Sequence, residues 1–131
     1  MNNMRVYNDI RMITLPKLED LQYYIYAIEN EVGYVKIGIS KDVSQRISSL
    51  SGSNGGGNKI IRVAISNPTY LKTLEGSFHT IFSRYRINGT EWFKGITFDE
   101  ILTKMNETFN SDSYFRCNEM RKQAGGYNSR K

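Results

Sequence analysis

The feature that most constrains the fold is an alternating stretch over residues 23–40, which reads YYIYAIENEVGYVKIGIS. Its first half is rich in aromatic and β-branched residues, a composition typical of strands. A short polar link, NEVG, separates this half from a second alternating run. Two such runs joined by a few polar residues predict an antiparallel hairpin.

Lys36 is the unexpected residue in the second strand of this hairpin. Alternate side chains of a strand point to opposite faces. One face is therefore apolar and the other half polar, the first consisting of Val35, Ile37 and Ile39 and the second of Tyr34, Lys36 and Gly38. We expect Lys36 to meet a polar partner on its own face.

The segment after the hairpin predicts a short amphipathic helix over residues 41–50. Ser40 is the expected N-cap, and Asp42 favours the first turn. The helix would bury three apolar residues at helical spacing, namely Val43, Ile47 and Leu50. The following SGSNGGGN, residues 51–58, contains too many glycines for regular structure and predicts a loop.

The rest of the chain predicts one more strand and two more helices. The strand is KIIRVAIS, residues 59–66, and a helix over residues 69–86 follows it. Residues 92–93 form a short extended piece, and a last helix begins at a capping box made by Thr97 and Glu100. The second helix would bury Leu71, Leu74, Phe78 and Ile81. The predicted class is α+β, with a small three-stranded antiparallel sheet flanked by helices.

Positive charge is concentrated at the end of the chain. The formal net charge is +5 and the isoelectric point is about 9.4, which points to a polyanionic partner such as nucleic acid. Residues 113–131 carry five basic residues against one acidic residue. They predict a mobile basic arm, in which Arg121 and Lys122 contact phosphates, or else a plain solvated terminus.

These patterns divide the 131 residues into three parts. Residues 1–22 are an N-terminal extension, either an appendage or an edge element, residues 23–112 form one domain, and residues 113–131 are the basic tail. A single cysteine excludes an internal disulfide, and no apolar run is long enough to span a membrane. Since the first residues also lack a signal-like apolar core, we expect a cytoplasmic protein.

The order of the motifs resembles the GIY-YIG endonuclease superfamily. The matching elements are Tyr24-Ile25-Tyr26, nine intervening residues, Lys36-Ile37-Gly38, Arg46 on the next helix, and Glu75 on the helix after the third strand. The KIG triplet, the Glu75-to-His79 spacing and the EWF at residues 91–93 resemble its phage T5-type subgroup more closely. The resemblance covers residues 23–93.

This resemblance implies a metal-dependent DNA endonuclease in which water attacks the phosphodiester and leaves a 3′-hydroxyl and a 5′-phosphate. Glu75 is the candidate ligand for Mg²⁺ or Mn²⁺, because magnesium prefers hard oxygen donors. Arg46 suits a phosphate clamp, since its planar guanidinium keeps its charge. Tyr26 is the candidate general base, although a free phenol has a pKa of about 10.

The two triplets depart from the family pattern, which begins the first with glycine and the second with tyrosine. Here Tyr24 and Lys36 occupy these positions. If the hairpin brings the Lys36 ammonium close to Tyr26, the positive charge lowers the pKa of the phenol. Either Lys36 takes over the role of the missing tyrosine at the attacking water, or Tyr34 does so from the same strand face.

Two further side chains complete the candidate site. His79, the single histidine, either donates to the phosphate or orients a water, or it is a structural residue beside an apolar helical face. Glu91 is a candidate substrate-binding residue whose carboxylate reaches the metal or pairs with Arg46.

Two other classes of protein fit the same sequence. One is a nucleic-acid-binding module on this fold without turnover, in which the altered second triplet marks lost catalysis. The other is a plain protein-interaction domain. Salt-sensitive DNA binding separates these two, and metal-dependent nicking separates the enzyme from the binding module.

Overall fold

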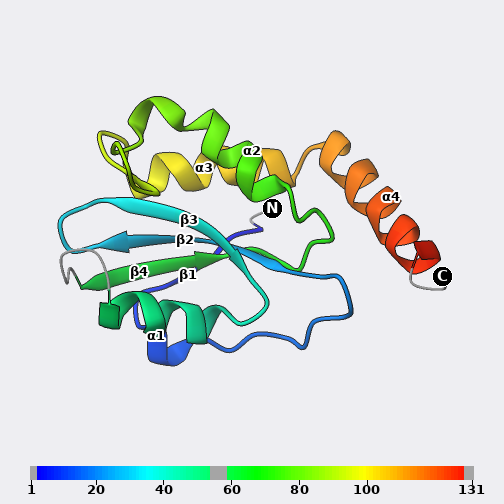
Figure 1. Cartoon of the computed structure of the whole chain (residues 1–131), viewed down its shortest axis with the longest axis horizontal. Coiled ribbons are helices and arrows are strands. Elements are labelled where there is room, and N and C mark those ends of the chain that lie inside the picture. Colours follow the sequence, from blue (N-terminus) through cyan, green and yellow to red (C-terminus); the bar gives the residue numbers. More distant parts are fainter. Residues whose placement is uncertain (1–2, 54–58, 129–131) are drawn as a thin grey trace.

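The computed structural model describes residues 3–53 and 59–128 (Figure 1). It contains one antiparallel sheet of five strands in the order β1-β4-β2-β3-β5. The strands are β1 Arg5–Tyr7, β2 Tyr24–Asn30, β3 Val35–Ser40, β4 Ile60–Ile65 and β5 Trp92–Phe93. The predicted α+β class and the three central strands are confirmed, and the count of three is corrected to five.

Two short strands extend the predicted sheet. The N-terminal segment supplies β1 at one edge, so that the edge-element alternative holds for this segment. The short extended piece at residues 92–93 supplies β5 at the other edge. The hairpin of β2 and β3 has the predicted antiparallel pairing, with Tyr26 opposite Gly38 and Ile28 opposite Lys36.

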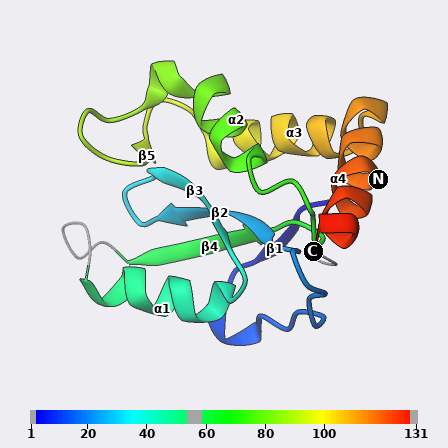
Figure 2. The same cartoon turned by 45° about the vertical axis from the view of Figure 1, so that its right-hand side comes forward.

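Helices cover both faces of the sheet (Figures 1 and 2). They are α1 Val43–Ser53, α2 Leu74–Ile81, α3 Phe98–Phe109 and α4 Asp112–Asn128, with 3₁₀ turns at Ile10–Met12 and Ser83–Tyr85. Helices α2 and α3 lie on one face, and α1 lies on the other with the N-terminal segment. Among the described residues, none of the helices has the length and apolarity to cross a membrane.

Each face of the sheet has its own apolar core, because alternate strand residues point to opposite sides. Ile25, Ala27, Val35 and Ile37 pack with side chains of α2, α3 and β5. Tyr24, Tyr26 and Ile28 pack on the opposite face with Val43 and Ile47 of α1. The predicted division of the second strand is therefore confirmed: its apolar and half-polar sets lie on different faces.

The helix ends show where sequence patterns succeed and fail. The capping box of α3 is present, since Thr97 Oγ1 accepts from the Glu100 N–H and the Glu100 carboxylate accepts from the Thr97 N–H. Helix α1 begins two residues later than expected, because Asp42, not Ser40, accepts from a backbone N–H of its first turn, that of Gln45. Ser40 instead accepts from the Asp42 N–H.

Two other helix predictions need correction. Helix α2 is shorter than residues 69–86, and Ile81 is exposed while Phe82 is buried. Phe82 lies four residues after Phe78, so it stacks on the same helical face. The predicted loop at residues 51–58 lies outside the described residues except for residues 51–53, which end α1.

The tail predicted as a mobile arm is a helix over most of its described length. Helix α4 is anchored at its start by buried Tyr114, and Asn118 Oδ1 accepts hydrogen bonds from Thr69 Oγ1 and the Tyr70 N–H at 3.0 and 2.8 Å. The rest of α4 projects from the body of the protein (Figure 1). Sequence patterning missed this helix because it has no apolar stripe.

Candidate active site

The candidate site lies at the edge of β3, beyond the point where β5 stops. β5 pairs only with Val35 and Lys36, so that the next carbonyl of β3, that of Ile37, has no strand partner on this side. Helix α2 supplies a partner instead, since His79 Nε2 lies 2.9 Å from the Ile37 oxygen. A carbonyl only accepts hydrogen bonds, so Nε2 carries the proton. His79 also packs on the ring of Phe93, at 5.4 Å between centroids.

Gly38 allows a side chain from the neighbouring strand to reach this edge. Tyr26, opposite Gly38 in β2, lies across the space that a side chain at position 38 would fill. A Cβ added at Gly38 would lie 2.3 Å from the Tyr26 hydroxyl oxygen and 2.4 Å from Cζ. The sheet register therefore fixes Tyr26, which is only 1% exposed, with its hydroxyl over β3.

Three charged side chains from different parts of the chain surround the Tyr26 hydroxyl. Burial raises the pKa of Tyr26 above its ordinary value of 10.0, and the Arg46 guanidinium opposes this rise through its charge and hydrogen bonding. The carboxylates of Glu75 and Glu91 raise the pKa further. Arg46 comes from α1, Glu75 from α2 and Glu91 from the turn before β5, so the fold brings together the groups that the sequence order suggested.

Lys36 has a different partner from the one expected. Its Nζ lies 2.5 Å from Glu91 Oε1, and it is not among the groups that shift the pKa of Tyr26. The prediction that Lys36 lowers the pKa of Tyr26 is therefore wrong, because burial raises this pKa, Arg46 is the cation that opposes the rise, and Glu91 engages the ammonium of Lys36. The expectation of a polar partner on the half-polar face is confirmed.

Glu91 is held as a carboxylate by its neighbours. The hydrogen bond from Lys36 and the charge of Lys36 lower the pKa of Glu91, with smaller contributions from His79 and Arg46. The Glu91 side chain is 59% exposed, whereas the Lys36 side chain is 10% exposed. A buried ammonium thus fixes a carboxylate at the surface.

Glu75 has the exposure and the chemistry of a metal ligand. Its side chain is 29% exposed, and its carboxylate lies 3.8 Å from His79 Nε2. Within residues 3–53 and 59–128, no group of three or more acidic, histidine or cysteine side chains is arranged to hold a metal ion. The donor that this part of the chain offers a divalent cation is the single carboxylate of Glu75, and Mg²⁺ can take water and substrate phosphate as its other ligands.

A hollow beside Arg46 has room for a phosphate. It measures about 290 Å³ and lies between the end of β3 and α1. Its lining is polar apart from Ile39 and comprises Ile39, Ser40, Asp42, Gln45, Arg46 and Ser49. Arg46 is exposed, so its guanidinium is accessible to a ligand from solvent.

Three predicted site residues lie apart from this cluster. Tyr34 precedes β3, and at about 3.3 Å per residue it lies about 13 Å along the strand from Gly38. Arg121 and Lys122 are exposed on the projecting part of α4. The structure therefore gives Tyr34 no place as a substitute at the phenol of Tyr26.

Gly38 is the site residue whose function the sequence left unrecognised. The sequence marks it as part of the KIG triplet and of the half-polar strand face, yet in the structure it determines whether Tyr26 fits. The sequence did not settle this pairing, because a four-residue NEVG link would place Ile37 opposite Tyr26. In the structure Asn30 belongs to β2 and its N–H donates to the Tyr34 carbonyl, and the shorter turn places Gly38 opposite Tyr26.

The fold and this cluster define a nuclease-like or DNA-binding module. Residues 22–110 match the T5orf172 domain, and the chain therefore belongs to this family. T5orf172 is a phage-associated domain related to the GIY-YIG-like nucleases, and its nuclease-like character implies interaction with DNA. Neither a curated protein nor a solved structure matches the chain.

Proposed function

We propose that the protein is a metal-dependent DNA endonuclease of the GIY-YIG type that hydrolyses phosphodiester bonds with water as the nucleophile. The observation that carries this proposal is the position of the Tyr26 hydroxyl. It lies over Gly38 amid the charges of Arg46, Glu75 and Glu91. A phosphodiester hydrolase needs a cationic phosphate clamp, a carboxylate for a divalent ion and a group that orients water.

Glu75 would hold the divalent cation. When bound, Mg²⁺ or Mn²⁺ supplies positive charge to the phosphate oxygens and lowers the pKa of water. The partial exposure of the Glu75 carboxylate leaves room for substrate and water beside it. His79 acts as a positioning residue, since its proton on Nε2 is directed at the Ile37 carbonyl and it holds α2 against the β3 edge.

Arg46 binds the phosphate and Tyr26 orients the water. A guanidinium offers two parallel donors to phosphate oxygens and stays charged at any working pH. The raised pKa of Tyr26 keeps the phenol protonated near neutral pH. In the free protein Tyr26 is thus a hydrogen-bonding group that fixes the attacking water, rather than a phenolate base.

Lys36 acts through Glu91. Its ammonium fixes the Glu91 carboxylate and lowers the pKa of that group, so that a negative charge is held near Arg46. This charge and the Arg46 guanidinium attract each other, which lowers the pKa of Glu91 slightly further. Lys36 and Glu91 are therefore positioning residues in this proposal, and neither one replaces the second-motif tyrosine at the attacking water.

The test is the nicking of supercoiled plasmid with Mg²⁺, with Mn²⁺ or with a chelator. Glu75→Gln and Arg46→Ala should each reduce the nicking rate about 100-fold or more, since removal of one charge-stabilising group typically costs about 10²–10³. The matched controls are Glu107→Gln on α3 and Arg11→Ala in the N-terminal segment, where each side chain is exposed and pairs only locally. Both controls should nick at the wild-type rate.

Two results would overturn the proposal. Nicking by Glu75→Gln at the wild-type rate would remove Glu75 as the metal ligand. DNA binding without nicking in either metal would leave a binding module on this fold.

A further inference from the structure

Two lysine side chains lie against the ring of Tyr23, outside the candidate active site. Lys41 Nζ lies 4.6 Å and Lys72 Nζ lies 5.6 Å from the centroid of this ring. Both distances are within the range of a cation–π contact. We name Tyr23, Lys41 and Lys72 the Tyr23 cluster.

The sheet brings these three residues together from separate segments. Tyr23 and Thr69 exchange backbone hydrogen bonds of 2.9 Å, which place the segment before α2 beside the start of β2. The pairing of Tyr24 with Ser40 places the next residue, Lys41, beside Tyr23. Backbone pairing within the sheet therefore places the three residues next to one another.

The two ammonium groups have no acidic partner. In the part of the chain that the structure describes, neither Lys41 nor Lys72 forms an ion pair. Lys41 Nζ donates to the Gln22 carbonyl at 3.0 Å, and the carboxylates of Glu19, Asp20 and Asp42 line the same hollow as Lys41 without forming an ion pair with it. Two like charges at one ring repel each other, and the ring offsets only part of this cost. An anion between them would offset the remainder.

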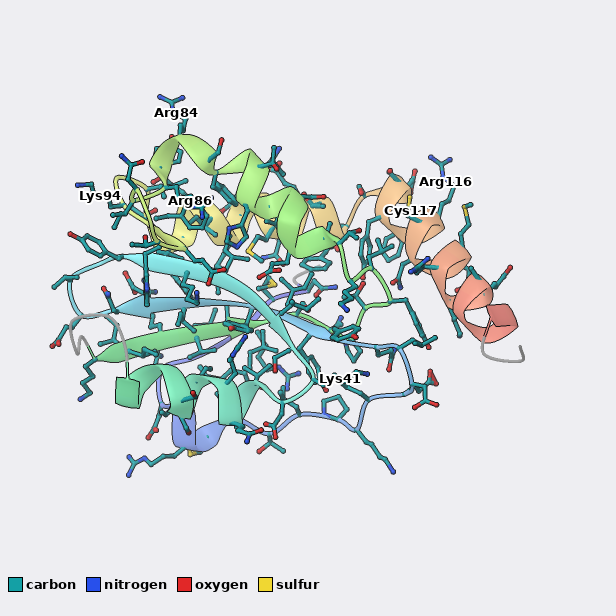
Figure 3. All side chains as sticks on the ribbon, viewed as in Figure 1. Lys41, Arg84, Arg86, Lys94, Arg116 and Cys117 are labelled. Carbon is teal, nitrogen blue, oxygen red and sulfur yellow. The ribbon has the colours of Figure 1, made fainter. Side chains whose placement is uncertain are left out.

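The cluster flanks the candidate active site. Lys41 follows β3, three residues after Gly38, and Lys72 precedes α2, three residues before Glu75. At about 3.3 Å per residue, Lys41 lies about 10 Å along the strand from Gly38, which is the axial rise of about three phosphates of one DNA strand. Figure 3 shows Lys41 at the end of β3 that leads into α1, with Arg84, Arg86 and Lys94 toward the opposite end.

We propose that the Tyr23 cluster is a binding subsite for the DNA backbone, in which Lys41 and Lys72 contact phosphates about three nucleotides from the bond that is cleaved. The position relative to that bond rests on the proposed nuclease function. The contact with DNA phosphates rests on the cluster itself. Tyr23 holds the two ammonium groups and offers part of its ring to the sugar–phosphate chain.

The test measures how binding to a short DNA duplex depends on salt, in chelator, so that cleavage does not contribute. Each phosphate contact contributes about 0.9 to the slope of log K against log salt. The double variant Lys41→Gln with Lys72→Gln should therefore reduce the slope by about 1.8. The charge-matched control, Arg11→Gln with Lys104→Gln, should leave the slope unchanged.

Two more variants separate charge from structure. Lys41→Arg with Lys72→Arg keeps both charges and should keep the slope. Tyr23→Leu also keeps both charges but removes the ring, so it should weaken binding several-fold with little change in slope. A slope for the Gln double variant equal to that of the control would overturn the subsite.

The outcomes for the subsite and for the nuclease are independent. Plasmid nicking with an unchanged slope in the Gln double variant rejects the subsite and leaves the nuclease intact. A reduced slope without nicking in any metal rejects the nuclease and supports the phosphate contacts. The position relative to the cleaved bond is tested with duplexes that carry a neutral methylphosphonate at a single backbone position. The ends of the nicked products locate the cut, and binding is measured separately for each modified duplex. Loss of binding should be greatest about three nucleotides from the cut, and a different position would reject the placement.

Discussion

The two faces of the sheet at β3 are built in opposite ways. Under α2 and α3 the space is filled by rings, with Phe78 against Phe109 at 5.8 Å and Phe82 against Phe93 at 6.1 Å between centroids. Under α1 the same strand presents a charged residue, Lys36, and a residue without a side chain, Gly38. One strand thus serves stability on one face and the candidate site on the other.

The difference follows from the alternation of the strand. A well-packed core needs large apolar side chains, whereas a site needs space and charge. Residues two apart in a strand lie on the same face, so each face can meet one of these requirements. Substitutions on the ring-filled face should therefore lower the free energy of unfolding and preserve activity per folded molecule. Substitutions of the two β3 residues on the α1 face, Lys36 and Gly38, should lower activity more than stability.

The largest effect on stability is expected for Phe109→Ala on the ring-filled face. Phe109 is fully buried and its ring contacts those of Phe78 and Tyr114. Truncation of a buried phenylalanine costs about 3–5 kcal/mol. Urea denaturation should show this loss, and the nicking rate corrected for the folded fraction should stay near the wild-type rate.

Gly38→Ala should have a smaller effect on stability and a large effect on activity. The new methyl group would overlap the Tyr26 ring, and overpacking of this kind costs about 1–3 kcal/mol. The ring would have to move, so nicking should fall strongly in the plasmid assay. Activity at the wild-type level would show that Tyr26 is not needed where the structure places it.

Gly76→Ala is the matched control for this substitution. Gly76 lies in α2, and an added Cβ meets no atom within 4 Å. Alanine is favoured over glycine in a helix interior by about 0.5–1 kcal/mol. The variant should therefore melt at a higher temperature and nick at the wild-type rate, whereas a loss of stability would contradict the open space around Gly76.

Alkaline pH should separate Tyr26→Phe from the wild type. Because folding raises the pKa of Tyr26 above 10.0, the folded state binds the phenolic proton more tightly, and stability falls as pH rises above that value. Tyr26→Phe lacks this titration and should lose less stability between about pH 10 and pH 11. Urea midpoints across this range test the difference, and parallel curves would contradict the burial of the hydroxyl.

The smallest effect is expected at acidic pH for Glu91→Gln. Folding lowers the pKa of Glu91 below 4.5, so its contribution is present above this value and is lost as pH falls through the folded pKa. The variant should show a shallower loss of stability below about pH 4.5. Because Glu91 is largely exposed, the difference should be small, and Asp99→Asn, also at the surface, serves as the control.

The central hairpin was predictable because its alternation extends over two strands with a short link between them. The edge strands were predicted only loosely, β1 as one of two alternatives for residues 1–22 and β5 as a short extended piece, since three and two residues are too few to show a period. Helix α4 was missed because its apolar residues share no face, and its anchor, Asn118, binds a segment 48 and 49 residues away in the sequence.

The site was predictable only in part. The order of the motifs grouped Tyr26, Arg46 and Glu75 correctly in space, while their catalytic roles stay predictions. The partner of Lys36 was beyond the sequence, because Glu91 lies 55 residues away and competes with Tyr26 for the same ammonium. The contact between Lys36 and Glu91 depends on where β5 begins, and a two-residue strand leaves no periodic pattern in the sequence.

The passage of the Tyr26 ring over Gly38 has a consequence for how the sequence can change. Any side chain gained at position 38 evicts the aromatic ring, and a small residue gained at position 26 leaves a void over the glycine. A change of size at one position therefore requires a compensating change at the other, although eleven residues lie between them. We therefore expect residue sizes at positions 26 and 38 to change together among related sequences.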